Sequence, residues 1–150
     1  MAREINDAGL ALIKQCEGCQ LDAYQDIAGI WTIGYGHIKG VMPGMRLTPE
    51  EAEQTLQDDL PGTQAAVEDA TRNAATSDNQ FSAMVSFAFN VGTANFRQST
   101  VLKEHLAGNY EKAADALLMW NKARVNGALT PVAGLANRRN AERTLYLADD

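Results

Sequence analysis

Residues 16–37, CEGCQLDAYQDIAGIWTIGYGH, decide the fold because they carry a predicted helix end straight into a predicted small sheet. They hold two carboxylates, Glu17 and Asp26, and one hydroxyl, Thr32. An amphipathic run ends at Gly18, which predicts that Glu17 lies on the last turn of a helix. Asp26 falls in a short loop, and Thr32 falls in a strand predicted over residues 30–35.

The predicted strand alternates large and small residues. The large residues that share one face are Trp31, Ile33 and Tyr35. Thr32 shares the other face with Gly34 and Gly36. Because side chains alternate across a strand, the large face is expected to pack, and the small face is expected to form an open floor where a ligand can approach the backbone.

Two carboxylates on different elements that face one cleft are what glycoside hydrolysis requires. One carboxyl must stay protonated to give its proton to the leaving oxygen, and the other must stay ionised to activate water or attack the sugar. A carboxyl at a helix end with apolar walls has its charged form disfavoured and can hold a proton at neutral pH. Most of the 19 Asp and Glu residues are expected to be solvated, so the pair alone does not decide the function.

The spacing of these residues resembles a known catalytic signature. Eight residues separate Glu17 from Asp26, five separate Asp26 from Thr32, and the segment TIGYGH begins at Thr32. This pattern is similar to the Glu/Asp/Thr triad of the phage-type lysozymes, glycoside hydrolase family 24. Two later segments, FAFNVG at 87–92 and NRRNAER at 137–143, resemble the lambdoid branch of that family. The resemblance covers roughly residues 6–148.

The resemblance implies an α+β, mainly α, lysozyme-like fold in a single catalytic domain, residues 1–150. A small N-terminal lobe with a β-sheet, about residues 1–61, and a helical C-terminal lobe, about residues 74–150, are expected on either side of a cleft. A polar helix predicted over residues 62–73 is expected to join the lobes, since its apolar stripe is thin.

For function, the resemblance implies an endolysin that hydrolyses the β-1,4 bond between N-acetylmuramic acid and N-acetylglucosamine in bacterial peptidoglycan and so lyses the host. Glu17 would be the general acid. Asp26 would stabilise the oxocarbenium-like transition state and orient water, and Thr32 would help to position that water. Inversion at the anomeric carbon is implied. Ile38 and Phe89 occupy positions that the family uses to line the sugar cleft, and no metal or organic cofactor is expected.

The expected partner is peptidoglycan, and the protein is expected to act as a monomer. The net charge of −6 argues against nucleic acid and against anionic membrane surfaces as partners. No run approaches about eighteen consecutive apolar residues, and the N-terminus lacks the apolar region of a signal peptide. We therefore expect accumulation in the host cytoplasm, with a separate membrane pore, a holin, giving access to the wall.

Capping signals predict where helices begin. Asn6 is a predicted N-cap, and Thr48 followed by Pro49 and Glu51 predicts a capping box on a helix that ends at Pro61. The remaining predicted helices cover residues 78–92, 100–106, 110–120 and the segment that follows Gly134. The first of these is apolar almost all round, as in a helix buried at the centre of a bundle.

Cys16 and Cys19 flank Glu17 as C-E-G-C. Zinc would need further ligands, but the chain has no other cysteine, and its two histidines, His37 and His105, lack metal-ligand spacing. A thioredoxin-like redox protein needs a βαβ context that is absent from the pattern. The simplest interpretation is two ordinary thiols. The alternative is a redox switch, in which a bridge would constrain the backbone at Glu17 and lower activity.

His37 is interpreted as a structural residue that hydrogen-bonds into the fold. Arg138, Arg139 and Arg143 form a basic cluster that could give a local positive patch on the acidic body. Arg138 and Arg139 could also pair with carboxylates or contact the peptide part of a substrate, but we interpret them as surface residues. The rival functions are a non-catalytic peptidoglycan-binding domain and a redox protein built on the two cysteines.

Overall fold

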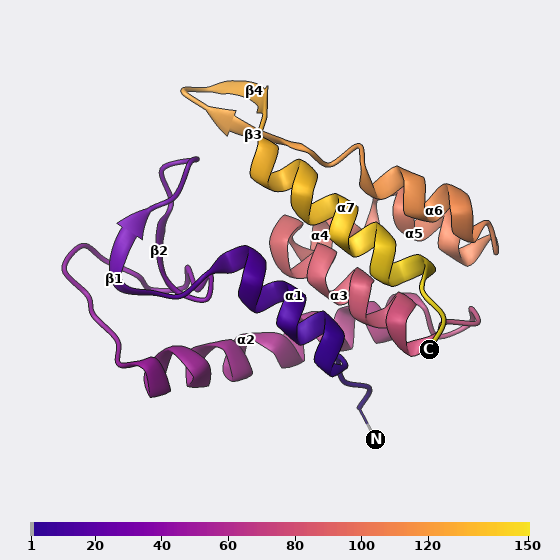
Figure 1. The fold of residues 1–150 in the computed structure, drawn as a ribbon, viewed down its shortest axis with the longest axis horizontal. Helices are drawn as coiled ribbons and strands as arrows, with labels where there is room; N and C mark the ends of the chain where they lie inside the picture. Colours follow the sequence, from indigo (N-terminus) through magenta and orange to yellow (C-terminus); the bar gives the residue numbers. More distant parts are fainter. Residues whose placement is uncertain (1) are drawn as a thin grey trace.

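The computed structural model describes residues 2–150, which form an α+β fold that is mainly α, as predicted (Figure 1). The helices are α1 (Asp7–Glu17), α2 (Pro49–Ala70), α3 (Asp78–Val91), α4 (Thr93–Arg97), α5 (Thr100–Leu106), α6 (Tyr110–Leu117) and α7 (Ala133–Leu147). The strands are β1 (Gln20–Gln25), β2 (Trp31–Gly34), β3 (Lys122–Val125) and β4 (Ala128–Pro131), which form two antiparallel pairs, β1–β2 and β3–β4. None of the helices in this range has both the length and the apolar character that crossing a membrane requires.

α3 lies at the centre of the helical part, with α1, α2, α4 and α7 packed against it (Figure 1). It begins after Ser77, whose side chain accepts a hydrogen bond from the Gln80 N–H, and it ends at Gly92. Its largest side chains with no exposed surface are Phe81, Met84 and Phe87. The prediction of a central buried helix is confirmed.

α1 carries Glu17 at its last position, as predicted. The helix starts because the side chain of Asn6 accepts a hydrogen bond from the Gly9 N–H. It ends because Gly18 takes a φ of 65°, which favours glycine, and donates its N–H back to the helix. α1 packs against α3 and α7, with Ile13 fully buried. This packing sets the position of Glu17 relative to the central helices.

α2 begins as predicted, with Thr48 and Glu51 forming a reciprocal capping box. The predicted end at Pro61 is wrong, because α2 continues as one helix to Ala70. The buried residues that run through the proline at helical spacing are Ala52, Leu56, Leu60, Gln64 and Val67. Their packing outweighs the cost of about 3 kcal/mol that proline brings to a helix interior. The helix predicted over residues 62–73 is therefore mostly the second half of α2, and the division into two lobes stays a prediction.

The β1–β2 hairpin places Thr32 opposite Tyr24 and packs against α2. The predicted open floor on the small face is wrong at Thr32, which is 4% exposed, and at Gly34. A Cβ at Gly34 would lie 3.4 Å from Thr55 Oγ1 and 3.5 Å from the Ala52 Cβ, both on α2. The face is closed because a helix that is distant in sequence covers it.

The β3–β4 hairpin is absent from the sequence predictions. Its strands pair in register from Lys122 opposite Pro131 to Val125 opposite Ala128. The turn residues Asn126 and Gly127 both have positive φ, 51° and 80°, which is the geometry that an Asn-Gly turn favours in a tight hairpin. Figure 1 places this hairpin at the N-terminal end of α7, on the same side of the helical part as β1 and β2.

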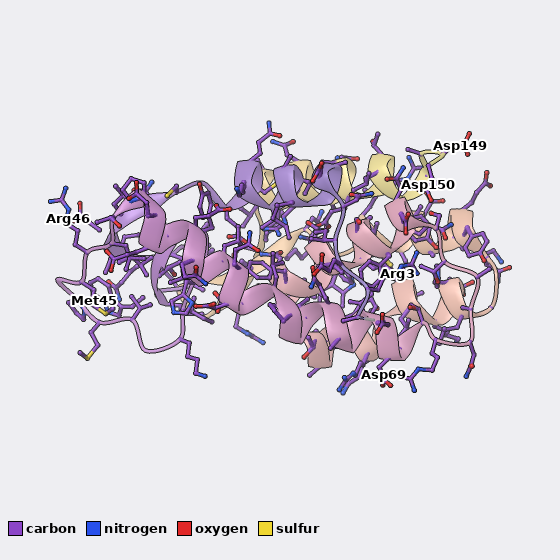
Figure 2. All side chains as sticks on the ribbon, turned by 90° about the horizontal axis from the view of Figure 1, so that it is seen from below. Arg3, Met45, Arg46, Asp69, Asp149 and Asp150 are labelled. Carbon is purple, nitrogen blue, oxygen red and sulfur yellow. The ribbon has the colours of Figure 1, made fainter. Side chains whose placement is uncertain are left out.

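Both ends of the described chain attach to the start of α3. Arg3 Nη2 donates to Asp78 Oδ1 at 2.9 Å, and a carboxylate oxygen of Asp150 accepts a hydrogen bond from the Asp78 N–H at 2.8 Å. Figure 2 labels Arg3 and Asp150 toward the end of the molecule opposite Met45 and Arg46. A carboxylate at a helix N-terminus is favourable, because the free N–H groups carry partial positive charge.

Candidate active site

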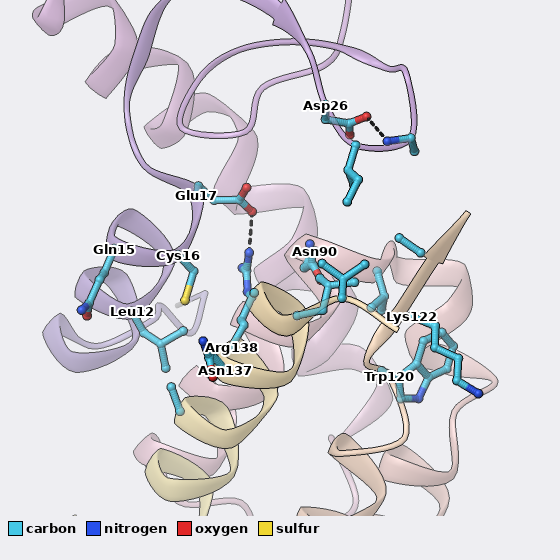
Figure 3. Close-up of a pocket in the computed structure, with 18 of the residues that line it drawn as sticks. Leu12, Gln15, Cys16, Glu17, Asp26, Asn90, Trp120, Lys122, Asn137 and Arg138 are labelled. Atoms are coloured by element: carbon cyan, nitrogen blue, oxygen red, sulfur yellow. Dashed lines mark hydrogen bonds and ion pairs between the residues drawn. The ribbon is translucent and has the colours of Figure 1, made fainter. Parts of the chain in front are cut away.

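Glu17 lies where α1, α7 and the segment after β2 meet. Its side chain is 18% exposed, and its Oε2 accepts a hydrogen bond from Arg138 Nη1 at 2.7 Å (Figure 3). On the other side it faces the backbone of Gly36, where a Cβ would lie 2.6 Å from Glu17 Oε1. The carboxylate is therefore held between a cation and a stretch of bare backbone.

The interpretation of Arg138 and Arg139 as surface residues is wrong. Their side chains are 4% and 0% exposed. Arg138 pairs with Glu17 and with Glu142, and Arg139 pairs with the same Glu142. Arg143 pairs with a surface carboxylate on α6. These three arginines do not form the positive patch that the sequence allowed, since two of the three charges are buried and all three are paired.

The charges around Glu17 act on its neighbours. Burial lowers the pKa of the Arg138 guanidinium, but the carboxylates of Glu17 and Glu142 outweigh burial and the pKa is raised. Arg138 is therefore a permanent cation beside Glu17. Burial raises the pKa of the Cys16 thiol, and Arg138 opposes that shift. Cys16 thus has no activated thiolate at neutral pH.

Asp26 follows β1, and its carboxylate organises the turn that leads to β2. Its Oδ1 accepts hydrogen bonds from the backbone N–H groups of Ala28 and Ile30, each at 2.9 Å. Figure 3 draws one of these bonds as a dashed line from the Asp26 carboxylate. These two bonds fix the direction of the carboxylate and leave Oδ2 without a hydrogen-bond partner in the described part of the chain.

Glu17 and Asp26 line one cavity of about 740 Å³. Figure 3 shows the two carboxylates reaching it from different elements, with Trp120 and Lys122 on another part of its wall. Burial raises the pKa of Tyr24, and the charges of both carboxylates add to this rise, so both act on the same surroundings. A cleft of this size with a few convergent polar groups is typical of a binding site.

The structure does not bring Thr32, Ile38 or Phe89 to the wall of this cavity. Thr32 is buried and donates its hydroxyl to the Ile30 carbonyl at 2.9 Å. Ile38 is 56% exposed after β2, and Phe89 is half-buried against the core. Within residues 2–150, none of these three lines the cavity, and their roles stay predictions.

The remaining candidates lie close to Glu17 or β2. His37 Nδ1 lies 2.7 Å from Asp59 Oδ2 on α2, which agrees with a structural role. Cys16 and Cys19 are both free and exposed, and Cys16 lines the cavity beside Glu17. The redox switch stays a hypothesis.

Sequence analysis missed cavity residues that come from far along the chain. They include Asn90, Trp120, Lys122 and Asn137, and Arg138, which was interpreted as a surface residue, lines the cavity with them. Trp120 also packs edge-to-face on Phe87, with ring centroids 5.5 Å apart, so it serves both core and cavity. The Asn126-Gly127 turn is the signal that could have placed Lys122 on a hairpin.

The fold and the cavity define a class: a mainly helical α+β protein that presents two carboxylates in one cleft. Comparisons with known proteins agree with this class. The family model described as phage lysozyme matches residues 14–142. An endolysin of Acyrthosiphon pisum secondary endosymbiont phage 1 is 42% identical over 142 residues, which cover 95% of this chain and 97% of that protein.

Two solved structures are similar along their whole length. The endolysin from Escherichia coli O157:H7 phage FAHEc1 has a TM-score of 0.88 and 42% identity, covering 98% of this chain and 95% of that one. The muramidase domain of SpmX from Asticaccaulis excentricus has a TM-score of 0.88 and 39% identity, covering 98% of this chain and 100% of that one. The chain belongs to the phage lysozyme family, and the predicted fold and enzyme class, a lysozyme-type glycoside hydrolase, are confirmed.

Proposed function

We propose that this chain hydrolyses the β-1,4 bond between N-acetylmuramic acid and N-acetylglucosamine in bacterial peptidoglycan, with Glu17 as general acid. The observation that carries the proposal is that Glu17 and Asp26 enter one cavity from two different elements. The cavity has a volume of about 740 Å³, which is within the range of sites that bind small ligands. Membership of the phage lysozyme family supports the same chemistry.

Glu17 gives its proton to the glycosidic oxygen as the bond breaks. Arg138 Nη1 holds Oε2 at 2.7 Å, so the proton is carried by Oε1, which faces Gly36. After the transfer, Arg138 stabilises the carboxylate that remains. A fixed cation that meets charge as it develops lowers the barrier without reorganisation.

Asp26 supplies the second carboxylate. Because Oδ1 is occupied by two backbone N–H groups, Oδ2 is the atom that faces the developing positive charge on the sugar or orients the attacking water. Thr32 is proposed to help position that water through the lone pairs of its hydroxyl, whose hydrogen is given to Ile30. Direct attack by water inverts the anomeric carbon.

Release of new reducing ends from purified sacculi tests this function. Glu17→Gln keeps an acceptor for Arg138 but has no acidic proton, so the rate should fall by roughly 10²-fold or more. Asp26→Asn keeps Oδ1 for the turn and removes the charge, and it should also lose activity. Glu111→Gln and Asp22→Asn, exposed residues with the same chemical change, should retain the wild-type rate.

The outcomes separate the rival functions. Binding to sacculi without reducing ends in the wild type would mean a non-catalytic wall-binding domain. Reductase activity that survives the Glu17→Gln substitution would mean a redox protein. Proton NMR of the first product tests the stereochemistry, since inversion gives the α-anomer and retention gives the β-anomer.

The cellular setting is a further part of the proposal. We infer that the protein acts as a monomer, accumulates in the host cytoplasm and reaches the wall through a separate membrane pore, after which the host lyses. The support is the similarity to named endolysins. Expression in Gram-negative cells with and without a pore-forming protein tests it, because lysis only with the pore is the expected result.

A further inference from the structure

A buried charge cluster lies directly behind Glu17. It consists of Arg138, Arg139 and Glu142 on α7, with Glu17 at its edge. The three α7 side chains are at most 4% exposed. The mechanism above uses Arg138 but leaves the other two α7 residues without a role.

Glu142 fixes the direction of Arg138. Its Oε2 accepts a hydrogen bond from Arg138 Nε at 3.2 Å and another from Ser86 Oγ at 2.6 Å. Arg138 Nη2 donates to the Ser86 carbonyl at 3.1 Å, and Nη1 is the group that reaches Glu17. Glu142 and Ser86 therefore hold Nε and Nη2 of the Arg138 guanidinium in place, and Nη1 points at Glu17, the candidate acid.

The cluster is not arranged for maximum stability. Arg139 Nε lies 2.9 Å from Glu142 Oε1 but forms no hydrogen bond with it, and Arg139 Nη1 has no hydrogen-bond partner within residues 2–150. Buried ion pairs with incomplete hydrogen bonding stabilise a fold less than apolar residues of the same size do. Orphaned buried polar atoms call for a reason other than packing.

We propose that Glu142 is a positioning residue that acts on Glu17 through Arg138, holding the guanidinium in place and offsetting part of its charge, and that Arg139 in turn offsets Glu142. This inference rests on the proposed role of Glu17 as general acid. Without Glu142, two guanidinium groups would face Glu17 alone, and the proton that Glu17 must donate would be held less tightly. Without Arg139, Glu142 would act more strongly, and that proton would be held more tightly.

The surroundings make these charges effective. Burial raises the pKa of the Glu142 carboxyl and the two arginines oppose that shift, while burial lowers the pKa of Arg139 to about 10. Arg139 therefore stays charged at neutral pH. The other groups close to the cluster are Cys16 on α1, Ser86 and Asn90 on α3, and Tyr24 on β1, beside Glu17. Burial raises the pKa of both Cys16 and Tyr24, so neither adds a charge at neutral pH, and the charge balance at Glu17 depends mainly on the cluster itself.

A charge-balanced set of variants tests the proposal by the pH profile of reducing-end release. The readout is the alkaline limb of this profile, which is the pH range in which activity falls as the general acid loses its proton. Glu142→Gln keeps an acceptor for Arg138 Nε but removes the negative charge, so the alkaline limb should move to lower pH by roughly one unit. Arg139→Gln removes a positive charge and should move the same limb to higher pH. The double variant restores the net charge and should return the limb close to the wild-type position. Glu111→Gln should move nothing.

Shifts of the alkaline limb in opposite directions in Glu142→Gln and Arg139→Gln would show a positioning role. A purely structural role would instead lower activity at every pH without moving the alkaline limb. If Glu142→Gln does not fold by circular dichroism, Arg139→Gln and Glu142→Asp carry the test, since Glu142→Asp keeps the charge and should keep the limb. If Glu142→Gln and Arg139→Gln both fold and neither moves the alkaline limb, the proposal is overturned. The proposed function would still stand in that case, provided that Glu17→Gln is inactive. An active Glu17→Gln would instead overturn the proposed function on which it rests.

Discussion

Gly36 lies against the carboxylate of Glu17, so closely that a Cβ at position 36 would be 2.6 Å from Glu17 Oε1. The glycine also has a φ of +74°, in the region that L side chains rarely adopt. Two independent physical reasons therefore require glycine here. The predicted small face of the strand is therefore not an open floor, because the Glu17 carboxylate occupies it at Gly36 and α2 closes it at Gly34.

Gly36→Ala is expected to displace Glu17 and lower kcat/KM by roughly 10²-fold, because a shift of about 1 Å is enough to misplace a reacting group. Gly40→Ala is the matched control. Gly40 has a similar φ of +71°, but nothing lies within 4 Å of its Cβ position. Both variants should lose similar stability from backbone strain, and only Gly36→Ala should lose activity. Equal rates for the two variants would show that the contact with Glu17 has no catalytic consequence.

Arg138→Met should destabilise the fold by about 3–5 kcal/mol, because it leaves the fully buried Glu142 with one cation fewer and Glu17 with none. Arg143→Met is the control on the same helix. Its ion pair with Asp115 is largely exposed, and removing it should cost about 1 kcal/mol or less. Urea unfolding of both variants at neutral pH measures the difference. A loss for Arg138→Met no greater than that for Arg143→Met would contradict the buried pair.

The stability of the fold should fall as the pH is lowered through the titration of His105. The ring is fully buried, with Nδ1 2.6 Å from the Tyr146 hydroxyl and Nε2 2.8 Å from Thr76 Oγ1, and burial lowers its pKa to about 4. The unfolded chain binds this proton near pH 6.5, so it holds more protons than the folded chain between about pH 6.5 and 4. The stabilisation by neutral His105 is complete above pH 6.5 and is lost toward pH 4, by about 3 kcal/mol at most.

His105→Gln removes this titration. The wild type should therefore lose more stability than the variant between pH 7.5 and pH 4.5, measured as the change in the urea midpoint. Carboxylates titrate in the same pH range in both proteins, so the contribution of His105 is measured as the difference between the two curves of urea midpoint against pH. Parallel curves would contradict the prediction, because they would mean that the pKa of His105 is the same in the folded and the unfolded chain.

Gly127→Ala should raise KM with little change in kcat. Gly127 has a φ of 80° in the β3–β4 turn, and this hairpin brings Lys122 to the cavity but not the two carboxylates. The strain costs about 1 kcal/mol and loosens the hairpin locally. Gly108→Ala, with a φ of 79° between α5 and α6, imposes the same strain away from the cavity and should leave KM unchanged. A KM that does not differ between the two variants would remove the hairpin from substrate binding.

Local signals in the sequence were sufficient for the elements around Glu17. The Asn6 cap, the Gly18 end of α1 and the Thr48–Glu51 capping box depend on residues a few positions apart, and each was predicted. Glu17 and Asp26 were predicted as partners from their spacing and from a family resemblance, and the structure places both on one cavity.

What could not be predicted depends on contacts between distant segments. Arg138 looks like a surface residue because Glu17 and Ser86, which bind it, lie 121 and 52 positions away. Arg139 looks like one because Asn90, which accepts its hydrogen bond, lies 49 positions away. Thr32 looks exposed because nothing near it in sequence indicates that α2 covers its face. Pro61 looks like a helix end because its cost is local, whereas the packing that outweighs it is not.

Oxidation of Cys16 and Cys19 to a disulfide is expected to lower activity. Both thiols are free and exposed, and α1 ends between them at Glu17 and Gly18. A bridge needs Cα atoms about 4.4–6.8 Å apart, which would tighten the chain around Glu17 and pull its carboxylate from Arg138 and Gly36. Reducing-end release should be slower after treatment with oxidised glutathione and should recover with dithiothreitol, with free thiols counted by mass spectrometry. Cys19→Ser, which cannot form the bridge, should be insensitive to both treatments. Equal rates for fully oxidised and fully reduced wild type would exclude the switch and leave the two cysteines as ordinary thiols.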